Sequence, residues 1–124
     1  MQLNSAKDLD VYKVAYQLAM EIFEVTKGFP AEERFALTGQ IRRRLAHASR
    51  RFKQTEREER YEAHFVSKLT DCDGENSETS SSLDFARDCK YITVECHSEL
   101  TTLCHQIGKM LGSVIKNPAP FLVR

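Results

Sequence analysis

The sequence has little of what interrupts regular structure, with five glycines, three prolines and no internal repeat among its 124 residues. This scarcity and an apolar content of 41% exclude collagen-like, low-complexity and fully disordered chains. The length predicts a single domain over residues 1–124, large enough to bury a core of its own.

Long apolar runs are also missing. The most apolar early stretch is interrupted by Lys13, Gln17 and Glu21, which excludes a membrane-spanning helix there and predicts no membrane partner. Residues 1–10 lack the apolar centre of a secretory signal, so we expect a cytoplasmic location. The four cysteines are then expected to be free thiols.

Catalytic and metal-binding motifs are absent from the sequence. It has no Gly-x-Ser-x-Gly and no glycine-rich phosphate loop, and we expect its four histidines to be solvated or to cap helices. Cys96 and Cys104 are eight residues apart on a predicted helix, about 12 Å, too far to share one ion. Asp71-x-Asp73-Gly74 places its glycine wrongly for a calcium loop. We therefore expect no enzyme, no metal and no cofactor.

The net charge is zero, but the charges are segregated along the chain. Residues 42–60 carry eight basic side chains against three acidic ones, a net charge of +5. Residues 71–99 carry eight acidic side chains against two basic ones, a net charge of −6. Such opposite charges bear on binding and on how segments pair.

Apolar residues recur at three- and four-residue intervals in four segments, which predicts helices over about residues 9–27, 31–57, 60–90 and 94–116. Thr93 is placed to cap the last helix, and Asn117-Pro118 to end it. No segment reads as a strand of useful length. Four helices with short connections predict an all-α protein, an antiparallel up-down four-helix bundle.

The first predicted helix has an unusually wide apolar face. Beside its main stripe runs a second one, formed by Tyr12, Tyr16, Ala19 and Phe23. Together the two stripes span roughly 200° of arc, more than a helix in a monomeric bundle needs. We interpret the second stripe as an interface between copies of the chain. A helix central to its own bundle is the alternative.

Residues 61–91 allow two interpretations. The segment 71–78 contains Asp71, Gly74 and Asn76 and reads locally as a loop, with a new helix from Ser81 or Ser82. The helical register of the apolar positions nevertheless continues through it without a shift. One long helix with a polar middle fits that register, because a break would have no reason to preserve it.

The arginine-rich segment carries the strongest functional signal. Guanidinium groups fork onto phosphate oxygens, and a cluster of them gives salt-dependent affinity that is blind to sequence. The candidate nucleic-acid contacts are Arg42, Arg43, Arg44, Arg50, Arg51, Lys53, Arg57 and Arg60. The alternative is a solvated face paired with the acidic helix of a neighbouring subunit.

Several blocks of sequence match a known pattern. They are residues 62–79 (EAHFVSKLTDCDGENSET), 83–92 (LDFARDCKYI), 10–15 (DVYKVA), 37–43 (LTGQIRR) and 107–113 (IGKMLGS). In these blocks the chain resembles the four-helix bundle protein family, which is the family of 23S rRNA intervening-sequence proteins. The resemblance covers about residues 8–43 and 60–117, whereas residues 44–59 depart from the family pattern.

The resemblance implies an up-down bundle that assembles as a ring, commonly a pentamer, and one long helix through Gly74. Some members are encoded within insertions of bacterial 23S rRNA. A related protein, the accessory variability determinant of diversity-generating retroelements, resembles a basic barrel that binds reverse transcriptase and RNA. The implied partners are therefore other copies of the chain, RNA or DNA, and a protein of an RNA complex, with no known catalysis.

Overall fold

The computed structural model describes residues 10–58 and 62–122, with side chains at 10–51 and 62–122. Four long helices are present, α1 (Asp10–Thr26), α2 (Leu37–Glu58), α3 (Glu62–Asp88) and α4 (Val94–Lys116). Two short 3-10 turns accompany them, η2 (Ala31–Glu33) and η3 (Ala119–Phe121). No strand occurs in this part of the chain. The prediction of an all-α protein with four helices is confirmed.

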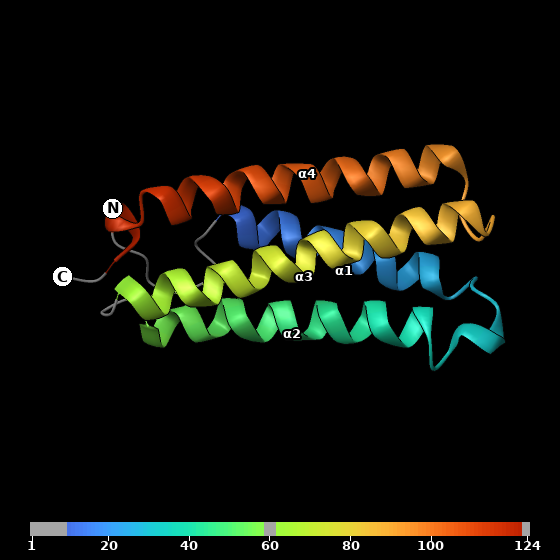
Figure 1. Cartoon of the computed structure of the whole chain (residues 1–124), viewed down its shortest axis with the longest axis horizontal. Helices are drawn as coiled ribbons and strands as arrows, with labels where there is room; N and C mark the ends of the chain where they lie inside the picture. Colours follow the sequence, from blue (N-terminus) through green and yellow to red (C-terminus); the bar gives the residue numbers. More distant parts are fainter. Residues whose placement is uncertain (1–9, 59–61, 123–124) are drawn as a thin grey trace.

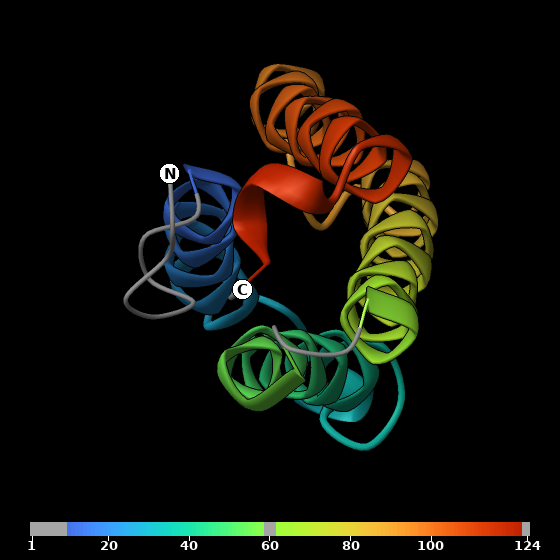
Figure 2. The same cartoon turned by 90° about the vertical axis from the view of Figure 1, so that its left-hand side faces the viewer.

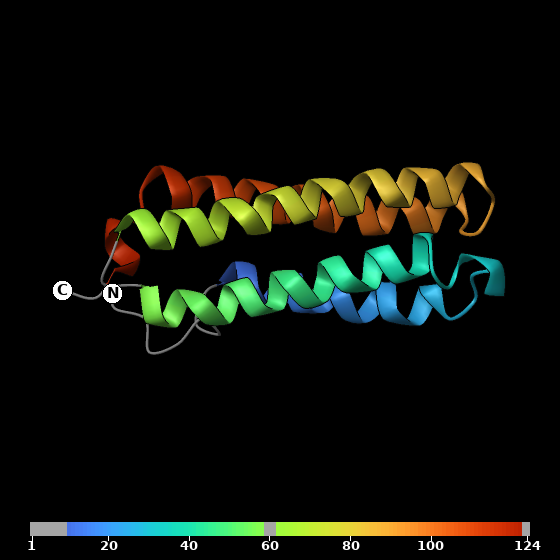
Figure 3. The same ribbon diagram turned by 60° about the horizontal axis from the view of Figure 1, so that its bottom comes forward.

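The four helices lie side by side, and successive helices run in opposite directions (Figures 1 and 3). Seen from the end, they surround one common centre (Figure 2). The closest packing joins α2 to α3, α3 to α4 and α4 to α1, whereas α1 and α2 touch only slightly. No helix within the described ranges is long and apolar enough to cross a membrane.

The core is formed by the apolar stripes that the helical periodicity predicted. All four helices contribute fully buried large side chains, which include Ile22, Ile41, Phe65, Leu69, Leu83 and Leu111. Burial of each such side chain stabilises the fold by about 1.5–3 kcal/mol relative to exposure. The helices are thus held mainly by a shared apolar centre.

The local interpretation of residues 71–78 as a loop is wrong, because α3 runs unbroken from Glu62 to Asp88. Cys72, Thr79 and Leu83 are all buried, so the helix presents one continuous face to the core. The Thr79 hydroxyl donates to the Glu75 carbonyl at 2.8 Å and thereby finds a partner within the helix. Tertiary packing therefore outweighs the poor helix propensity of the glycine and serines in this stretch.

The second helix begins later than the predicted residue 31. Residues 31–33 form η2, and α2 starts only at Leu37. The chain between them folds back over the first turn of α2, where a Cβ at Gly39 would lie 2.6 Å from the Arg34 carbonyl oxygen. The Tyr91 hydroxyl holds this segment by donating to Glu33 at 2.9 Å, a hydrogen bond that raises the pKa of Tyr91 to about 12.

The corner between α3 and α4 forms as predicted. Lys90 adopts a left-handed conformation (φ 65°), and the Tyr91 amide donates to the Ala86 carbonyl at 2.9 Å. The Thr93 hydroxyl accepts from the Cys96 amide at 3.0 Å, which confirms the predicted N-cap. This corner fixes how the acidic end of α3 meets the start of α4.

Candidate nucleic-acid interface

The arginines of the first turns of α2 point to different sides of the helix, because successive residues are turned by about 100°. Arg42 faces the end of α1. Its Nε donates to Thr26 Oγ1 at 3.1 Å, and its guanidinium carbon lies 4.7 Å from the centre of the Phe23 ring. Its Nη2 also reaches the Phe23 carbonyl at 3.5 Å. Arg42 thus places a positive charge at the carboxyl end of α1, where it is stabilising.

Arg44 faces α3 and is largely used there. Its Nε lies 2.9 Å from Glu78 Oε2, and its Nη1 donates to Ser82 Oγ at 2.6 Å and to the Glu78 carbonyl at 3.3 Å. Only 22% of its side chain is exposed. Arg44 therefore joins α2 to α3 and has little capacity left for phosphate.

Two further contacts continue this pairing along the helices. His47 Nδ1 lies 4.0 Å from Glu75 Oε1, and Arg51 Nε lies 3.5 Å from Asp71 Oδ2. The numbers rise along α2 while they fall along α3, so these two helices run in opposite directions. The acidic partner that the sequence placed on a neighbouring subunit is, for these residues, α3 of the same chain.

Arg43 and Arg50 differ from the other arginines. Both are exposed, and neither makes an ion pair among the side chains that the structure describes. They are seven residues apart, which puts them on one side of α2 with about 10.5 Å between them along the axis. Arg57 follows Arg50 after another seven residues of α2. The side chains of Lys53 and Arg57 and the whole of Arg60 lie outside the described part.

The four residues of the predicted interface on α1 differ in how exposed they are. Tyr16 is 56% exposed and Phe23 is 42% exposed. Tyr12 stacks on Tyr16 with ring centres 6.4 Å apart, but it also packs against the core, as a partly buried side chain. Tyr12, Tyr16 and Ala19 line a cavity of about 40 Å³ to which all four helices contribute side chains. Only Tyr16 and Phe23 therefore offer substantial surface to a partner.

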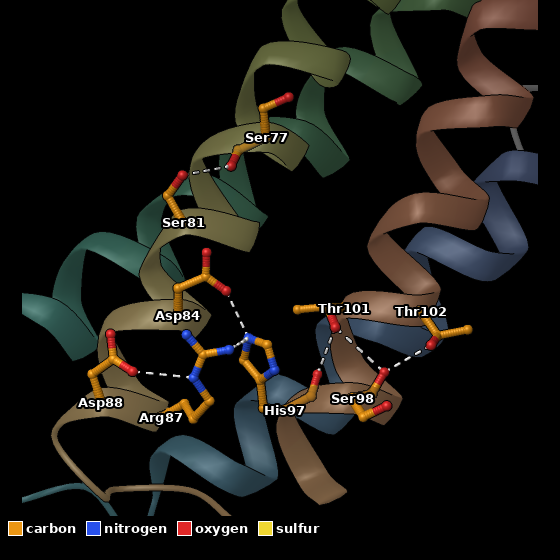
Figure 4. A network of polar contacts seen from close by, with 9 residues as sticks. All are labelled: Ser77, Ser81, Asp84, Arg87, Asp88, His97, Ser98, Thr101 and Thr102. Carbon is orange, nitrogen blue, oxygen red and sulfur yellow. Dashed lines mark hydrogen bonds and ion pairs between the residues drawn. The ribbon is translucent and has the colours of Figure 1, made fainter. Parts of the chain in front are cut away.

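A polar cluster at the α3–α4 end was missed from the sequence. His97, expected to be solvated or capping, has only 13% of its side chain exposed, and its Nε2 lies 2.6 Å from Asp84 Oδ1 (Figure 4). Arg87 approaches the same nitrogen at 3.5 Å and pairs with Asp88 at 3.1 Å. The sequence feature that could have predicted this contact is the corner at residues 91–93, because a tight turn there brings Asp84 and His97 onto facing helices.

The cysteines are all free, as expected. Burial raises the pKa of the Cys72 thiol to about 12 and that of the Cys104 thiol to about 11. Cys72 donates weakly to the Ala48 carbonyl across 3.7 Å. Among the described residues no three potential ligands gather as they would around a metal ion. Among the residues that the structure describes, Arg43 and Arg50 therefore stand out as exposed positive charge.

Comparison with known proteins agrees with this architecture. A solved structure of a protein of unknown function from the S23 ribosomal protein family of Bacteroides thetaiotaomicron is similar, with a TM-score of 0.76 and 26% identity. The match covers 86% of this chain and 96% of that chain. No curated protein matches the chain. The family model described as 23S rRNA-intervening sequence protein matches residues 7–113. The chain therefore belongs to the 23S rRNA-intervening sequence protein family.

Proposed function

We propose that the protein is a non-enzymatic, oligomeric helical module that binds nucleic acid, in the first place RNA, in the cytoplasm. The observation that carries this proposal is the difference among the arginines of α2. Arg42, Arg44 and Arg51 are engaged within the chain, whereas Arg43 and Arg50 are exposed on one side of the helix. Exposed guanidinium groups on one side of a helix, without an ion pair among the described side chains, fit a phosphate backbone.

The binding expected from such a row is electrostatic. Each phosphate that an arginine neutralises releases counterions, so the affinity falls as the salt concentration rises. The name of the family links it to intervening sequences of 23S rRNA, and this link makes RNA the first nucleic acid to test. Because each copy presents the same two arginines, an oligomer repeats them and gains affinity from several simultaneous contacts.

The test compares two charge-matched double variants by fluorescence anisotropy with a labelled single-stranded RNA over a salt series. We expect Arg43→Gln with Arg50→Gln to weaken binding and to reduce the logarithmic salt slope by roughly 0.7 for each phosphate that is no longer neutralised. Lys109→Gln with Lys116→Gln removes the same charge from exposed sites on α4 and serves as the control. Equal losses of affinity in both variants, or a flat salt response of the parent, would contradict the proposal.

The oligomer is the second part of the proposal. We propose an up-down bundle that closes into a ring of identical subunits, with a pentamer favoured, through Tyr16 and Phe23. Large exposed aromatic side chains in one helical stripe support an interface. Light scattering on Tyr16→Lys tests it against Val94→Lys, which changes a side chain that is 67% exposed on α4. Dissociation by the first variant alone is the expected result.

A protein scaffold without nucleic-acid contact is the alternative, and the exposed stripe on α1 is what favours it. Oligomeric state and RNA binding, measured on the parent and on the double variant, distinguish the nucleic-acid module from the scaffold. If the ring persists in the Arg43→Gln, Arg50→Gln variant while RNA binding is lost, the arginines serve nucleic acid. If the parent oligomer binds no RNA even at low salt, the scaffold is correct.

A further inference from the structure

Phe35 is the most exposed of the large apolar side chains that the structure describes. It lies between η2 and α2, and 86% of its surface is accessible to solvent. The turn that carries it belongs to the end of the bundle where α3 also turns into α4 (Figure 1). Single exposed apolar side chains are common on protein surfaces, so the groups around Phe35 decide how it is interpreted.

An arginine lies beside this ring. The guanidinium carbon of Arg34 is 6.0 Å from the centre of the Phe35 ring, within reach of a cation–π contact. Arg34 is itself exposed and makes no ion pair among the side chains that the structure describes. The sequence did not identify it as a candidate contact for nucleic acid, because it precedes the arginine-rich segment.

Gly39 connects this position with the exposed arginines of α2. A Cβ at Gly39 would lie 2.6 Å from the Arg34 carbonyl oxygen and 3.1 Å from Arg43 Nη1. Residue 34 and the guanidinium of Arg43 therefore approach the same glycine, on the side of α2 that Arg43 occupies. Arg50 follows on that side two turns later, about 10.5 Å along the axis. Phe35 thus stands at the amino-terminal end of the row of exposed arginines.

The carboxylates of η2 do not cancel this positive charge. Glu33 accepts a hydrogen bond from the Tyr91 hydroxyl at 2.9 Å and is therefore directed towards the corner between α3 and α4. Against the remaining Glu32 stand Arg34 and Arg43, and both are exposed. The surface around Phe35 thus combines an accessible aromatic ring with an excess of positive charge.

We propose that this surface binds unpaired bases of RNA, with a base stacked on the Phe35 ring and the flanking phosphates held by Arg34 and Arg43. The inference rests on the proposed function and names single-stranded RNA as its substrate. Proteins that bind single strands combine positive charge along the backbone with aromatic rings on which bases stack. Paired bases of a duplex already stack on one another, so their faces are not available to a surface ring.

An apolar anchor for a protein partner explains Phe35 less well. The anchors of protein interfaces lie at the centre of a desolvated patch. Burying Phe35 in this way would also take the guanidinium of Arg34 out of water, and a charge without an opposite partner is costly to desolvate. An RNA strand brings its own counter-charge, because each base that stacks is attached to phosphates that an arginine can bind.

The test compares a labelled single-stranded RNA with the same strand annealed to its complement, by fluorescence anisotropy with the full chain. We expect Phe35→Ala to weaken binding of the single strand about fivefold or more, as loss of one base stack does. The logarithmic salt slope should not change, because no phosphate contact is removed. The affinity for the duplex should also stay the same. Arg34→Gln should instead reduce the slope for the single strand by roughly 0.7.

Further variants separate stacking from simple apolar contact. Phe35→Trp keeps an aromatic ring and should retain binding of the single strand. Phe35→Leu keeps an apolar side chain without a ring and should bind as weakly as Phe35→Ala. Phe85→Ala makes the same change at another exposed ring, on α3, and should bind like the parent. The high exposure of position 35 means that none of its variants should disturb the fold.

Several results would overturn the inference. One is an unchanged single-strand affinity in Phe35→Ala; the proposed function would still stand if Arg43→Gln with Arg50→Gln weakens binding. Equal losses in Phe35→Ala and Phe85→Ala, or an equal loss on the duplex, would also overturn it. Dissociation of the oligomer by Phe35→Ala would assign the ring to a second copy of the chain. A parent that binds no RNA at low salt would contradict the proposed function itself.

Discussion

Arg44 Nη1 donates a hydrogen bond of 2.6 Å to the hydroxyl of Ser82, a serine only 9% exposed in the second half of α3. This bond links the most basic helix to the most acidic one within a single chain. It also explains a serine on the inward side of α3, because a buried hydroxyl requires a partner. Part of the positive charge that the sequence assigned to a binding surface, that of Arg44, therefore serves to hold α2 against α3.

Removing this link is expected to lower stability. Arg44→Ala leaves the Ser82 hydroxyl without its partner and removes the alkyl chain that covers it, so we expect a loss of about 1–2 kcal/mol. The ion pair adds little to this figure, because 62% of the Glu78 side chain is exposed and its charge is screened. Urea unfolding measures the change. Arg50→Ala is the control and should stay within about 0.5 kcal/mol, so equal losses of stability would contradict the assignment.

Which arginines of α2 contact other helices and which face solvent could not be predicted from the sequence. Eight basic side chains between residues 42 and 60 look equivalent in the sequence. In the fold, Arg42 turns to α1, Arg44 to α3, and Arg43 between them to solvent. The direction of each one depends on which side of α2 is buried. The apolar spacing shows that side only roughly, because leucine and alanine are few in this helix.

Helix ends were predictable where a local side chain determines them. The limits of α1 and α4 agree with the prediction to within one residue, and the Thr93 cap was identified from its sequence position. The start of α2 was not predictable in the same way. It depends on the Arg34 carbonyl lying over Gly39 and on Tyr91 bonding to Glu33, contacts that the spacing of apolar residues does not encode.

The Thr93 cap should be measurable by itself. Thr93→Ala removes the acceptor for the Cys96 amide and should destabilise the protein by about 1 kcal/mol. Thr102→Ala is the matched control on the same helix, where the hydroxyl only bonds back to the Ser98 carbonyl. Thermal unfolding of both variants provides the comparison. A destabilisation of the control as large as that of Thr93→Ala would show that the cap contributes nothing specific.

Alkaline pH should destabilise the fold through its buried thiols. The pKa of Cys72 is raised from 9.0 to about 12, so between these values the unfolded chain has lost this proton and the folded chain keeps it. The stabilisation is present below pH 9 and is lost as the pH rises towards 12. Urea unfolding at several pH values should therefore show a falling free energy of unfolding.

The variant Cys72→Ala separates this effect from the remaining groups. It should be less stable than the parent at neutral pH, because it loses buried side-chain volume, but its stability should fall less steeply above the ordinary thiol pKa of 9.0. Cys89→Ala, which changes an exposed thiol, should follow the parent curve. An unchanged alkaline slope in Cys72→Ala would refute the role of this thiol.

Two glycine substitutions test the corrected helix boundaries together. A Cβ at Gly74 would meet no atom within 4 Å, whereas one at Gly39 would lie 2.6 Å from the Arg34 carbonyl oxygen. Gly74→Ala should therefore stabilise α3 by about 0.5–1 kcal/mol, through helix propensity and a less flexible unfolded chain. Gly39→Ala should destabilise by about 1–3 kcal/mol, because the segment before α2 must move away.

Both changes are read from urea unfolding, and each serves as the control for the other, since the chemical change is the same. If residues 71–78 formed a loop, alanine at position 74 would bring no gain from helix propensity. If α2 began at residue 31 as a regular helix, the Arg34 carbonyl would be directed along the helix and alanine at position 39 would be tolerated. A stabilising Gly39→Ala together with a neutral or destabilising Gly74→Ala would therefore contradict both corrections.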